Sequence, residues 1–207
     1  MKIAVFGTVG AGKTKVSEAL CQQLNFNLFK EPLEENPYFN DFYQDMKGFA
    51  FKMQIYMLIT RIEQFFKIDN LENTIFDRTI LEDPVFVRVS HLLEIMNDVD
   101  FNVYNRFFQN VITPILKQKL GFDVIIYLKV STTKAVERIK HRGRISELET
   151  PHHYWEKLNE QYEVLYEELK DHYHFIVVDA DNDNFTEKIT FIMQKLLMLN
   201  NEVRSLI

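Results

Sequence analysis

The chain has 207 residues, of which 46% are hydrophobic and 26% are charged, which is typical of one globular domain. The formal net charge of −6 argues against a broad basic surface for nucleic acid, and the single cysteine excludes an intrachain disulfide. No apolar run reaches transmembrane length and no signal peptide precedes the first one, so we expect a cytoplasmic protein with neither a nucleic-acid nor a membrane partner.

Short runs of apolar and β-branched residues predict five strands, at about 2–6, 27–30, 73–77, 123–129 and 174–178. Helical patterns occupy the segments between these runs. Strands that alternate with helices predict an α/β fold, in which a parallel sheet is covered by helices on both faces. No linker, repeat or low-complexity segment interrupts the chain, so we expect a single domain over residues 1–207.

The segment after the first strand, GTVGAGKT, matches G-x-x-x-x-G-K-[ST], the loop that wraps nucleotide phosphates. Its glycines let the backbone approach an anion, and the following helix adds the positive end of its dipole. Lys13 would reach the β- and γ-phosphates, and Thr14 would offer its hydroxyl to Mg²⁺. A chance match is disfavoured because the motif lies between a strand and a helix. The predicted ATP-binding loop consists of Gly7, Thr8, Val9, Gly10, Ala11, Gly12, Lys13, Thr14 and Lys15.

Charged residues follow the next two strands at the carboxyl edge, where open α/β sheets bind ligands. Glu31 could take a proton from a hydroxyl acceptor, or it could be an ordinary solvated loop acid. Asp77 suits Mg²⁺ or proton transfer, and Arg78 suits the transferring phosphoryl group. The alternative for this pair is an acid at a helix start with its own ion pair. Glu82 and Asp83 follow within about one helical turn.

The segment 49–66 is apolar nearly all round, which predicts a buried helix. Gln54, Met57 and Arg61 are spaced i, i+3, i+7 and share one face of it. Buried polar groups need partners, so these side chains either make internal structural bonds or line a pocket for a flat, polar ligand. Asp83 is the candidate partner for the arginine charge.

Two further helical patterns, at 80–97 and 101–119, carry apolar residues at core-like spacing and show no chemistry. We interpret them as structure or as a subunit interface, and His91 as a surface or core residue. The paired His152 and His153 have no third ligand at metal spacing, so we expect no zinc site.

Three arginines gather after the fourth strand. Arg138 and Arg142 are spaced i, i+4 on a predicted helix, and Arg144 follows just beyond it. Three cations that converge would repel one another unless an anion joined them, which favours a lid at about 141–150 that closes over phosphates. The alternative is a solvated basic helix end, which the helix dipole also favours.

Taken together, these motifs resemble those of the deoxynucleoside kinases, most closely the small bacterial deoxyadenosine/deoxyguanosine kinases of mycoplasma-like organisms. The resemblance covers nearly the whole chain in the family's order, through GTVGAGKT, KEP, ENPYF, FKMQIYM, FDRT, LEDP, RIKHRGR and VVDAD. It implies a P-loop kinase fold with a five-stranded parallel sheet and an arginine-bearing lid. It also implies Mg²⁺-dependent transfer of the ATP γ-phosphoryl group to the 5′-hydroxyl of a purine deoxynucleoside, with deoxyadenosine preferred over deoxyguanosine and deoxycytidine.

The resemblance assigns roles at the acceptor hydroxyl. Glu31 and Asp77 would both lie there, and which of them takes the proton stays open. Asp77 would also reach Mg²⁺ beside Thr14, and Arg78 would touch the acceptor oxygen. The family often has serine where this chain has Thr79, a mild departure. The other acceptor contacts would come from Tyr43 and Glu147 at the sugar 3′-OH, and from Gln54, Met57, Arg61 and Asp83 around the base.

On the donor side, the resemblance makes Arg138, Arg142 and Arg144 the lid arginines, and the loop 179–185 would contact the donor adenine. Members of the family are commonly dimers through helices that flank the sheet, so we expect a homodimer. Two alternatives remain: a nucleoside monophosphate kinase and a non-enzymatic nucleotide-dependent switch. The first would need a cationic site for the acceptor phosphate, whereas the acceptor region offers mostly acids and aromatics, and the second lacks the N-K-x-D base-reading motif.

Overall fold

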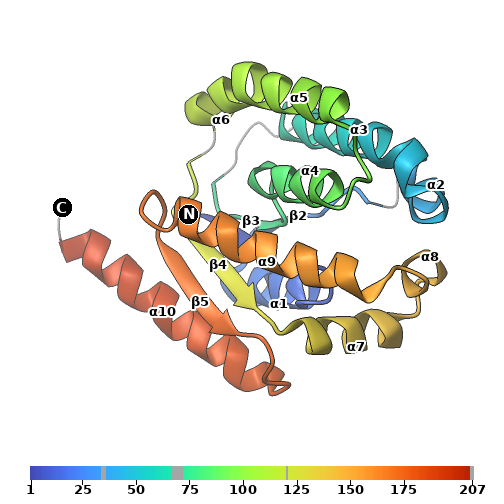
Figure 1. Cartoon of the computed structure of the whole chain (residues 1–207). Coiled ribbons are helices and arrows are strands. Elements are labelled where there is room, and N and C mark those ends of the chain that lie inside the picture. The colour runs from blue at the N-terminus through green and yellow to red at the C-terminus, as the bar shows by residue number, and fades with distance from the viewer. Residues whose placement is uncertain (34–35, 67–71, 120, 206–207) are drawn as a thin grey trace.

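The structure is a computed structural model that describes residues 1–33, 36–66, 72–119 and 121–205. Its centre is a five-stranded sheet in which all neighbouring strands are parallel (Figure 1). In spatial order the strands are β2 (Asn27–Phe29), β3 (Thr74–Asp77), β1 (Lys2–Phe6), β4 (Val124–Lys129) and β5 (Phe175–Asp179). Each strand begins and ends within about one residue of its predicted position, so the predicted five-stranded parallel sheet is confirmed.

The connections between the strands are helical. The helices before β3 are α1 (Lys13–Leu24), α2 (Phe39–Gln44) and α3 (Met46–Phe66). Between β3 and β4 lie the 3-10 helix η1 (Ile80–Glu82), α4 (Asp83–Leu92), α5 (Asp98–Phe107), the π-helix η2 (Phe108–Ile112) and α6 (Thr113–Lys119). The remaining helices are α7 (Thr132–Arg142), α8 (Ile145–Leu148), α9 (His152–Leu169) and α10 (Phe185–Ser205).

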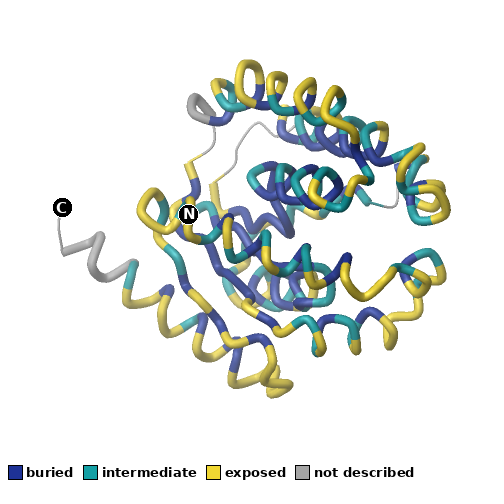
Figure 2. Tube along the Cα trace, in the orientation of Figure 1, coloured by how far each residue is buried: buried dark blue, intermediate teal, exposed yellow. Residues whose placement is uncertain are grey.

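Alternate residues of the central strands face opposite layers of helices. Ile3 and Val5 of β1 join a core with α1 and α10, whereas Ala4 and Phe6 join a core with α3, α4 and α9. Figure 1 shows these two layers on either side of the sheet, and Figure 2 shows the buried residues concentrated in the sheet and on the inner sides of the helices. Among the described residues, no helix is long and apolar enough to cross a membrane.

The two helical patterns after β3 have different limits from those predicted. The first helix, α4, ends at Leu92 instead of continuing to residue 97, because Glu94 adopts a left-handed backbone conformation (φ 54°). The next helix, α5, begins earlier than predicted because the side chain of Asn97 caps it by accepting a hydrogen bond from the amide of Asp100 at 2.9 Å.

Candidate active site

The phosphate loop leads from β1 into α1, and its glycines make its shape possible. Gly10 has a positive φ of 84°, and a Cβ atom there would lie 2.4 Å from the carbonyl oxygen of Ala135. Lys13, on the first turn of α1, donates to the carbonyl oxygens of Gly7 (2.7 Å) and Thr8 (2.9 Å). Burial, and next the charge of Arg78, lower the pKa of Lys13 to about 8. The motif therefore adopts the strand–loop–helix arrangement that the sequence predicts.

A hydroxyl and a carboxylate meet beside this loop. Thr14 donates to Oδ2 of Asp77 at 2.6 Å, while Oδ1 of Asp77 is buried and has no hydrogen-bond partner among the described residues. Burial raises the pKa of Asp77. Among the described residues no three His, Cys, Asp or Glu side chains gather at one point. One carboxylate and one hydroxyl fit Mg²⁺, which takes few protein ligands and completes its shell with phosphate oxygens and water.

A buried network of two acids and two arginines lies next to Asp77. Glu31 Oε1 accepts from Arg61 Nη2 at 2.9 Å and lies 3.2 Å from Arg78 Nη1, and Arg61 Nε lies 3.0 Å from Asp83 Oδ1. Burial disfavours the Glu31 carboxylate, but the two arginine charges outweigh it and lower its pKa. For Asp83 burial prevails over the arginines and raises the pKa to about 6.

The structure decides two alternatives that the sequence left open. Glu31 is held by two arginines and is not a solvated loop acid. Arg61 forms the predicted pair with Asp83, but it also binds Glu31, and it lines the cleft as well. The structural and the pocket-lining interpretations of Arg61 therefore both hold.

Arg78 has an unusual backbone for a non-glycine residue. Its φ of 67° lies in the left-handed region, which costs roughly 1–2 kcal/mol for an L-residue. The turn ends β3 and places the guanidinium 4.6 Å from the ring centroid of Phe86 and beside Glu31. Strain of this kind is retained mainly where it positions a functional group. No pattern in the sequence indicates it, since an asparagine or glycine would be expected at such a turn.

A cleft of about 1410 Å³ joins these groups along the carboxyl edge of the sheet. Most of the residues that the sequence singles out line it: Val9, Gly10, Ala11, Gly12, Lys13, Thr14, Lys15, Glu31, Tyr43, Gln54, Met57, Arg61, Asp77, Arg78, Asp83, Arg138, Arg142, Arg144 and Glu147. Gly7 and Thr8 lie beneath its floor and hold Lys13. Glu35, the first residue of the ENPYF motif, lies outside the described residues.

The arginines beyond β4 are paired with acids, and they do not all meet. Arg142 Nη2 lies 2.5 Å from Oε2 of Glu147, and Arg144 Nη1 lies 3.7 Å from its Oε1. Arg138 instead donates to the carbonyl oxygen of Ala180 (2.7 Å) and to Asp183 (2.8 Å). All three arginines line the cleft, but Arg142 and Arg144 share one acid, whereas Arg138 pairs with another.

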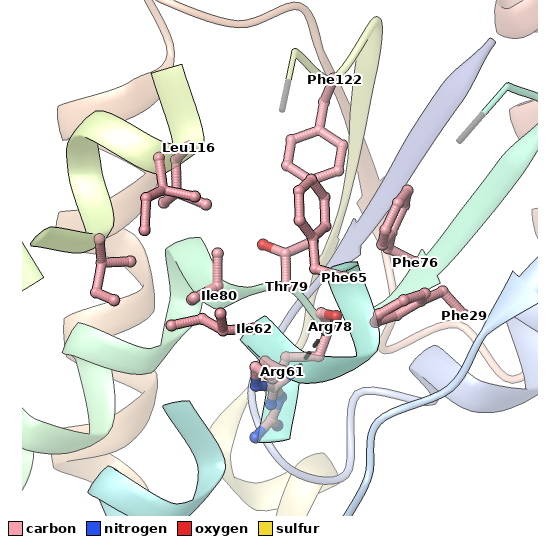
Figure 3. A pocket seen from close by; sticks show the side chains of 12 residues that line it. Phe29, Arg61, Ile62, Phe65, Phe76, Arg78, Thr79, Ile80, Leu116 and Phe122 are labelled. Atoms are coloured by element: carbon pink, nitrogen blue, oxygen red, sulfur yellow. Dashed lines mark hydrogen bonds between the residues drawn. The ribbon is translucent and has the colours of Figure 1, made fainter. Parts of the chain in front are cut away.

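A second, small cavity borders Arg61 and Arg78, which also line the cleft (Figure 3). Its volume of about 30 Å³ holds one or two water molecules at most, and its walls are apolar side chains such as Phe65, Phe76 and Phe122. The hydrogen bond from Arg61 Nη1 to the carbonyl oxygen of Arg78, at 3.4 Å, closes one end of it. The cavity is too small for a nucleoside.

Glu82 is a site residue to which the sequence assigns no role. It is completely buried, accepts from the amides of Thr79 (2.9 Å) and Gly7 (3.3 Å), and accepts from the Tyr162 hydroxyl at 3.0 Å. Burial raises its pKa to about 7. The pattern T-x-x-E at residues 79–82 is a capping-box signature that predicts the bond to Thr79, and the structure contains that capping box. Nothing in the sequence predicts the bond to the phosphate loop.

Comparison with known proteins identifies the family. The deoxynucleoside kinase family model matches residues 3–200. The deoxyadenosine kinase of Dictyostelium discoideum is 37% identical over 177 residues, which cover 85% of this chain and 69% of that protein. The deoxyadenosine/deoxycytidine kinase of Bacillus subtilis (strain 168) is 34% identical over 171 residues, which cover 78% of this chain and 74% of that protein.

Solved structures agree with the relatives. The deoxyadenosine kinase from M. mycoides with bound dCTP superposes with a TM-score of 0.87 at 48% identity, covering 96% of this chain and 100% of that one. The same enzyme with bound dATP gives a TM-score of 0.87 at 50% identity, covering 95% and 99%. The chain therefore belongs to the deoxynucleoside kinase family.

Proposed function

We propose that this deoxynucleoside kinase transfers the γ-phosphoryl group of ATP to the 5′-hydroxyl of a purine deoxynucleoside and prefers deoxyadenosine, with deoxyguanosine and deoxycytidine as further acceptors. The observation that carries the proposal is the buried network of Glu31, Arg61, Arg78 and Asp83, which lies in one cleft with the phosphate loop. The names of the relatives support the choice of acceptor. A nucleoside monophosphate kinase and a nucleotide switch, the two alternatives from the sequence, do not fit membership of this family.

On the donor side, the loop amides would bind the ATP phosphates, and Lys13 would exchange the carbonyl oxygens of Gly7 and Thr8 for phosphate oxygens. Phosphate charge favours the protonated amine, so Lys13 would be a cation in the complex despite its lowered pKa. Thr14 and the unpaired Oδ1 of Asp77 would hold Mg²⁺, which offsets negative charge on the phosphates.

On the acceptor side, Glu31 would take the proton of the 5′-hydroxyl while Arg78 stabilises the charge of the transferring group. The lowered pKa keeps Glu31 ionised but makes it a weak base. A weak base takes the proton late, once the new P–O bond has begun to form. Late transfer suits the loose transition state of phosphoryl transfer, in which the attacking oxygen gains little charge early. We assign the proton to Glu31 because Asp77 is committed to Thr14 and the metal.

The base and the sugar would contact the other cleft residues. Gln54 would bond the base edge, with Met57 narrowing the pocket and Arg61 and Asp83 facing the base as a pair. Tyr43 and Glu147 would hold the sugar 3′-hydroxyl. Burial, together with the charges of Tyr154 and Glu147, raises the pKa of Tyr43 well above its usual range, so its phenol would act as a neutral hydrogen-bonding group.

The segment at about 141–150 would act as a lid. Glu147 holds Arg142 and Arg144 in the structure, and we propose that both arginines move to the phosphates when ATP binds. Arg138 and the loop 179–185 would instead contact the donor nucleoside, since Arg138 is tied to Asp183 and Ala180 in that loop.

We also propose a homodimer in which α3 and α5 meet their counterparts. The two helices pack against each other, and Ile59, Val99, Val103 and Phe107 on them are exposed. Replacing Val103 by Lys should convert the dimer to a monomer in sedimentation equilibrium, because the charge would be buried in an apolar interface. The exposed Val164→Lys on α9 is the matched control. A wild-type chain that sediments as a monomer at micromolar concentration would refute the dimer.

The function is tested by incubating the protein with ATP, Mg²⁺ and each of the common deoxynucleosides in turn, and separating the products. We expect 5′-monophosphates from deoxyadenosine first and from deoxyguanosine and deoxycytidine more slowly. ATP hydrolysis that does not depend on an acceptor, or phosphorylation of monophosphates alone, would contradict the proposal.

A further inference from the structure

The completely buried carboxyl group of Glu82 joins three parts of the fold that are far apart in sequence. Its Oε2 accepts from the amide of Thr79, and its Oε1 accepts from the amide of Gly7 and the hydroxyl of Tyr162. We infer that Glu82 is a positioning residue for phosphoryl transfer: it fixes the start of the phosphate loop against the Asp77–Arg78 turn, and so sets the distance between donor and acceptor.

The sheet itself does not make this connection. The last bond of the β1–β3 ladder runs from the amide of Arg78 to the carbonyl oxygen of Val5 at 3.3 Å. In a continued parallel ladder the next donor would be the amide of Gly7, and its acceptor would be the carbonyl oxygen of Arg78. That carbonyl is unavailable, because the left-handed turn at Arg78 directs it to Arg61. Glu82 supplies the missing acceptor from its side chain.

The position of this bond connects the two halves of the reaction. Gly7 is the first residue of the phosphate loop, and its carbonyl oxygen is one of the two that hold Lys13. The other end of the link, Thr79, directly follows the residue proposed to act on the acceptor. The side chain of Glu82 therefore links the phosphate loop directly to the turn at Asp77–Arg78. A small displacement between reacting groups can reduce a rate by about 100-fold, so a rigid link here affects the rate directly.

A purely structural role in the helix cap would not require a carboxyl group at Glu82. The capping box needs one side-chain oxygen at Glu82, and glutamine serves that purpose equally well. The second oxygen binds the phosphate loop and Tyr162, and complete burial disfavours its charge, as the raised pKa of Glu82 shows. The helix cap alone does not explain why a carboxyl group is buried at this position. The bond to Gly7 does explain it.

The test uses three variants of the full-length protein, with ATP and Mg²⁺ as donor and deoxyadenosine as acceptor. Glu82→Gln can keep the bond to Thr79 through its amide oxygen, but then presents an N–H group to the amide of Gly7. Glu82→Asp keeps the charge but is too short to reach both amides. Tyr162→Phe is the matched control, because it removes a bond from the same oxygen and leaves the bond to Gly7 in place.

We expect both Glu82 variants to lose about 10- to 100-fold in kcat/KM for ATP, with the loss partly in kcat. The dissociation constant of deoxyadenosine, measured by calorimetry without ATP, should stay within about twofold, because no acceptor contact changes. The control should lose less than about threefold in kcat/KM, even though its melting temperature falls.

Two results would overturn the inference. The first is a loss of less than fivefold in the Glu82 variants, which would show that the carboxyl group only supports the fold. The second is an equal loss in Tyr162→Phe, which would show that any damage to this buried cluster slows the enzyme. If Glu82→Gln does not fold, Glu82→Asp decides the matter on the same thresholds, since Thr79 still caps η1 in that variant.

Discussion

At the scale of single residues, the proposed proton acceptor is Glu31, whose charge is stabilised by two arginines. Arg61 and Arg78 lie 2.9 Å and 3.2 Å from the same carboxylate oxygen, and their charges lower the pKa of this acid despite its burial. Removing its charge has two consequences. It abolishes the proposed proton acceptor, and it leaves two buried arginines with one counter-charge fewer.

We predict that Glu31→Gln lowers kcat by about 10²- to 10⁴-fold, the usual contribution of general-base catalysis. The amide keeps the shape and a hydrogen-bond acceptor for the arginines, so the dissociation constant of the deoxynucleoside should change much less. Steady-state kinetics together with calorimetric titration separate the two effects. The control is Glu163→Gln on α9, which loses an ion pair with Lys129 outside the cleft. A loss of kcat below fivefold would assign the proton to Asp77.

At the scale of elements, two arginines of the proposed lid between α7 and α9 are paired with the acid Glu147. Glu147 on α8 is almost fully buried and binds Arg142 and Arg144, the residues proposed to reach the γ-phosphoryl group. Arg138, one helical turn before Arg142 on α7, instead donates to Ala180 and Asp183 in the loop that we propose to contact the donor. Removing Arg142 or Arg144 should therefore change the kinetics in a different way from removing Arg138.

Arg142→Ala and Arg144→Ala should lower kcat more than ATP affinity, because their contacts form chiefly while the phosphoryl group is in transfer. Arg138→Ala should weaken ATP binding with a smaller effect on kcat. Single-turnover kinetics and ATP titration distinguish these patterns. If Arg142→Ala bound ATP more weakly but kept the wild-type kcat, the arginine would only attract the nucleotide.

The sequence predicts the secondary-structure elements well, but it predicts few of the contacts between them. Periodicity and motif position predict the five strands and place Glu31, Asp77 and the phosphate loop at one edge of the sheet, because parallel strands end together. Apart from the pair of Arg61 with Asp83, the sequence does not predict which polar groups pair across long separations. The bond of Arg61 to Glu31 joins residues 30 apart, and the bond of Glu82 to Gly7 joins residues 75 apart.

Two local features were also beyond prediction. The left-handed turn at Arg78 contradicts the intrinsic preference of arginine, so it depends on tertiary contacts that hold the backbone there. The early end of α4 at Leu92 depends on the left-handed residue Glu94, which hydrophobic periodicity does not detect.

At the scale of the whole molecule, the cleft concentrates positive charge in a protein whose net charge is −6. Each of the described arginines that line the cleft is paired with an acid: Arg61 and Arg78 with Glu31, Arg138 with Asp183, and Arg142 and Arg144 with Glu147. Asp77, Glu82 and Asp83, in or beside the cleft, are buried acids whose pKa values are raised by burial, so stability should depend on pH.

Glu82 gives the clearest pH effect. Burial raises its pKa from about 4.5 to about 7, against the opposing charges of Arg78 and Lys13. The folded state therefore binds this proton more tightly than the unfolded state, and the resulting stabilisation is complete below pH 4.5 and is lost as pH rises through 7. The melting temperature of the wild type relative to Glu82→Gln should fall between pH 5 and pH 7 and then level off.

The size of this effect should be several degrees, since about 1 kcal/mol shifts the melting temperature of a domain of this size by roughly 2–4 °C. Calorimetry of both ligand-free proteins at pH 5, 6, 7 and 8 measures it. The difference in melting temperature between the two proteins cancels the contribution of Asp83, whose pKa is also raised by burial. A difference in melting temperature that stays constant across this range would contradict the assigned ionisation.

The choice of base involves the cleft as a whole. Arg61 and Asp83 form a buried pair that offers donors and acceptors along one edge of a base, and Met57 limits the space beside them. Thymine adds a methyl group and presents a different edge, so it would meet both a steric and a hydrogen-bonding penalty. Changing the pair, as Arg61→Met with Asp83→Ala, should therefore relax the discrimination between bases.

The most direct test of the account is competition between deoxyadenosine and thymidine for the wild-type enzyme, with ATP and Mg²⁺ in excess. A site built to bond one polar edge can reject a mismatched ligand by about 10⁴-fold, because its own buried groups are left unpaired. We predict a ratio of kcat/KM values that approaches this figure in favour of deoxyadenosine. Phosphorylation of thymidine as efficient as that of deoxyadenosine would contradict the account.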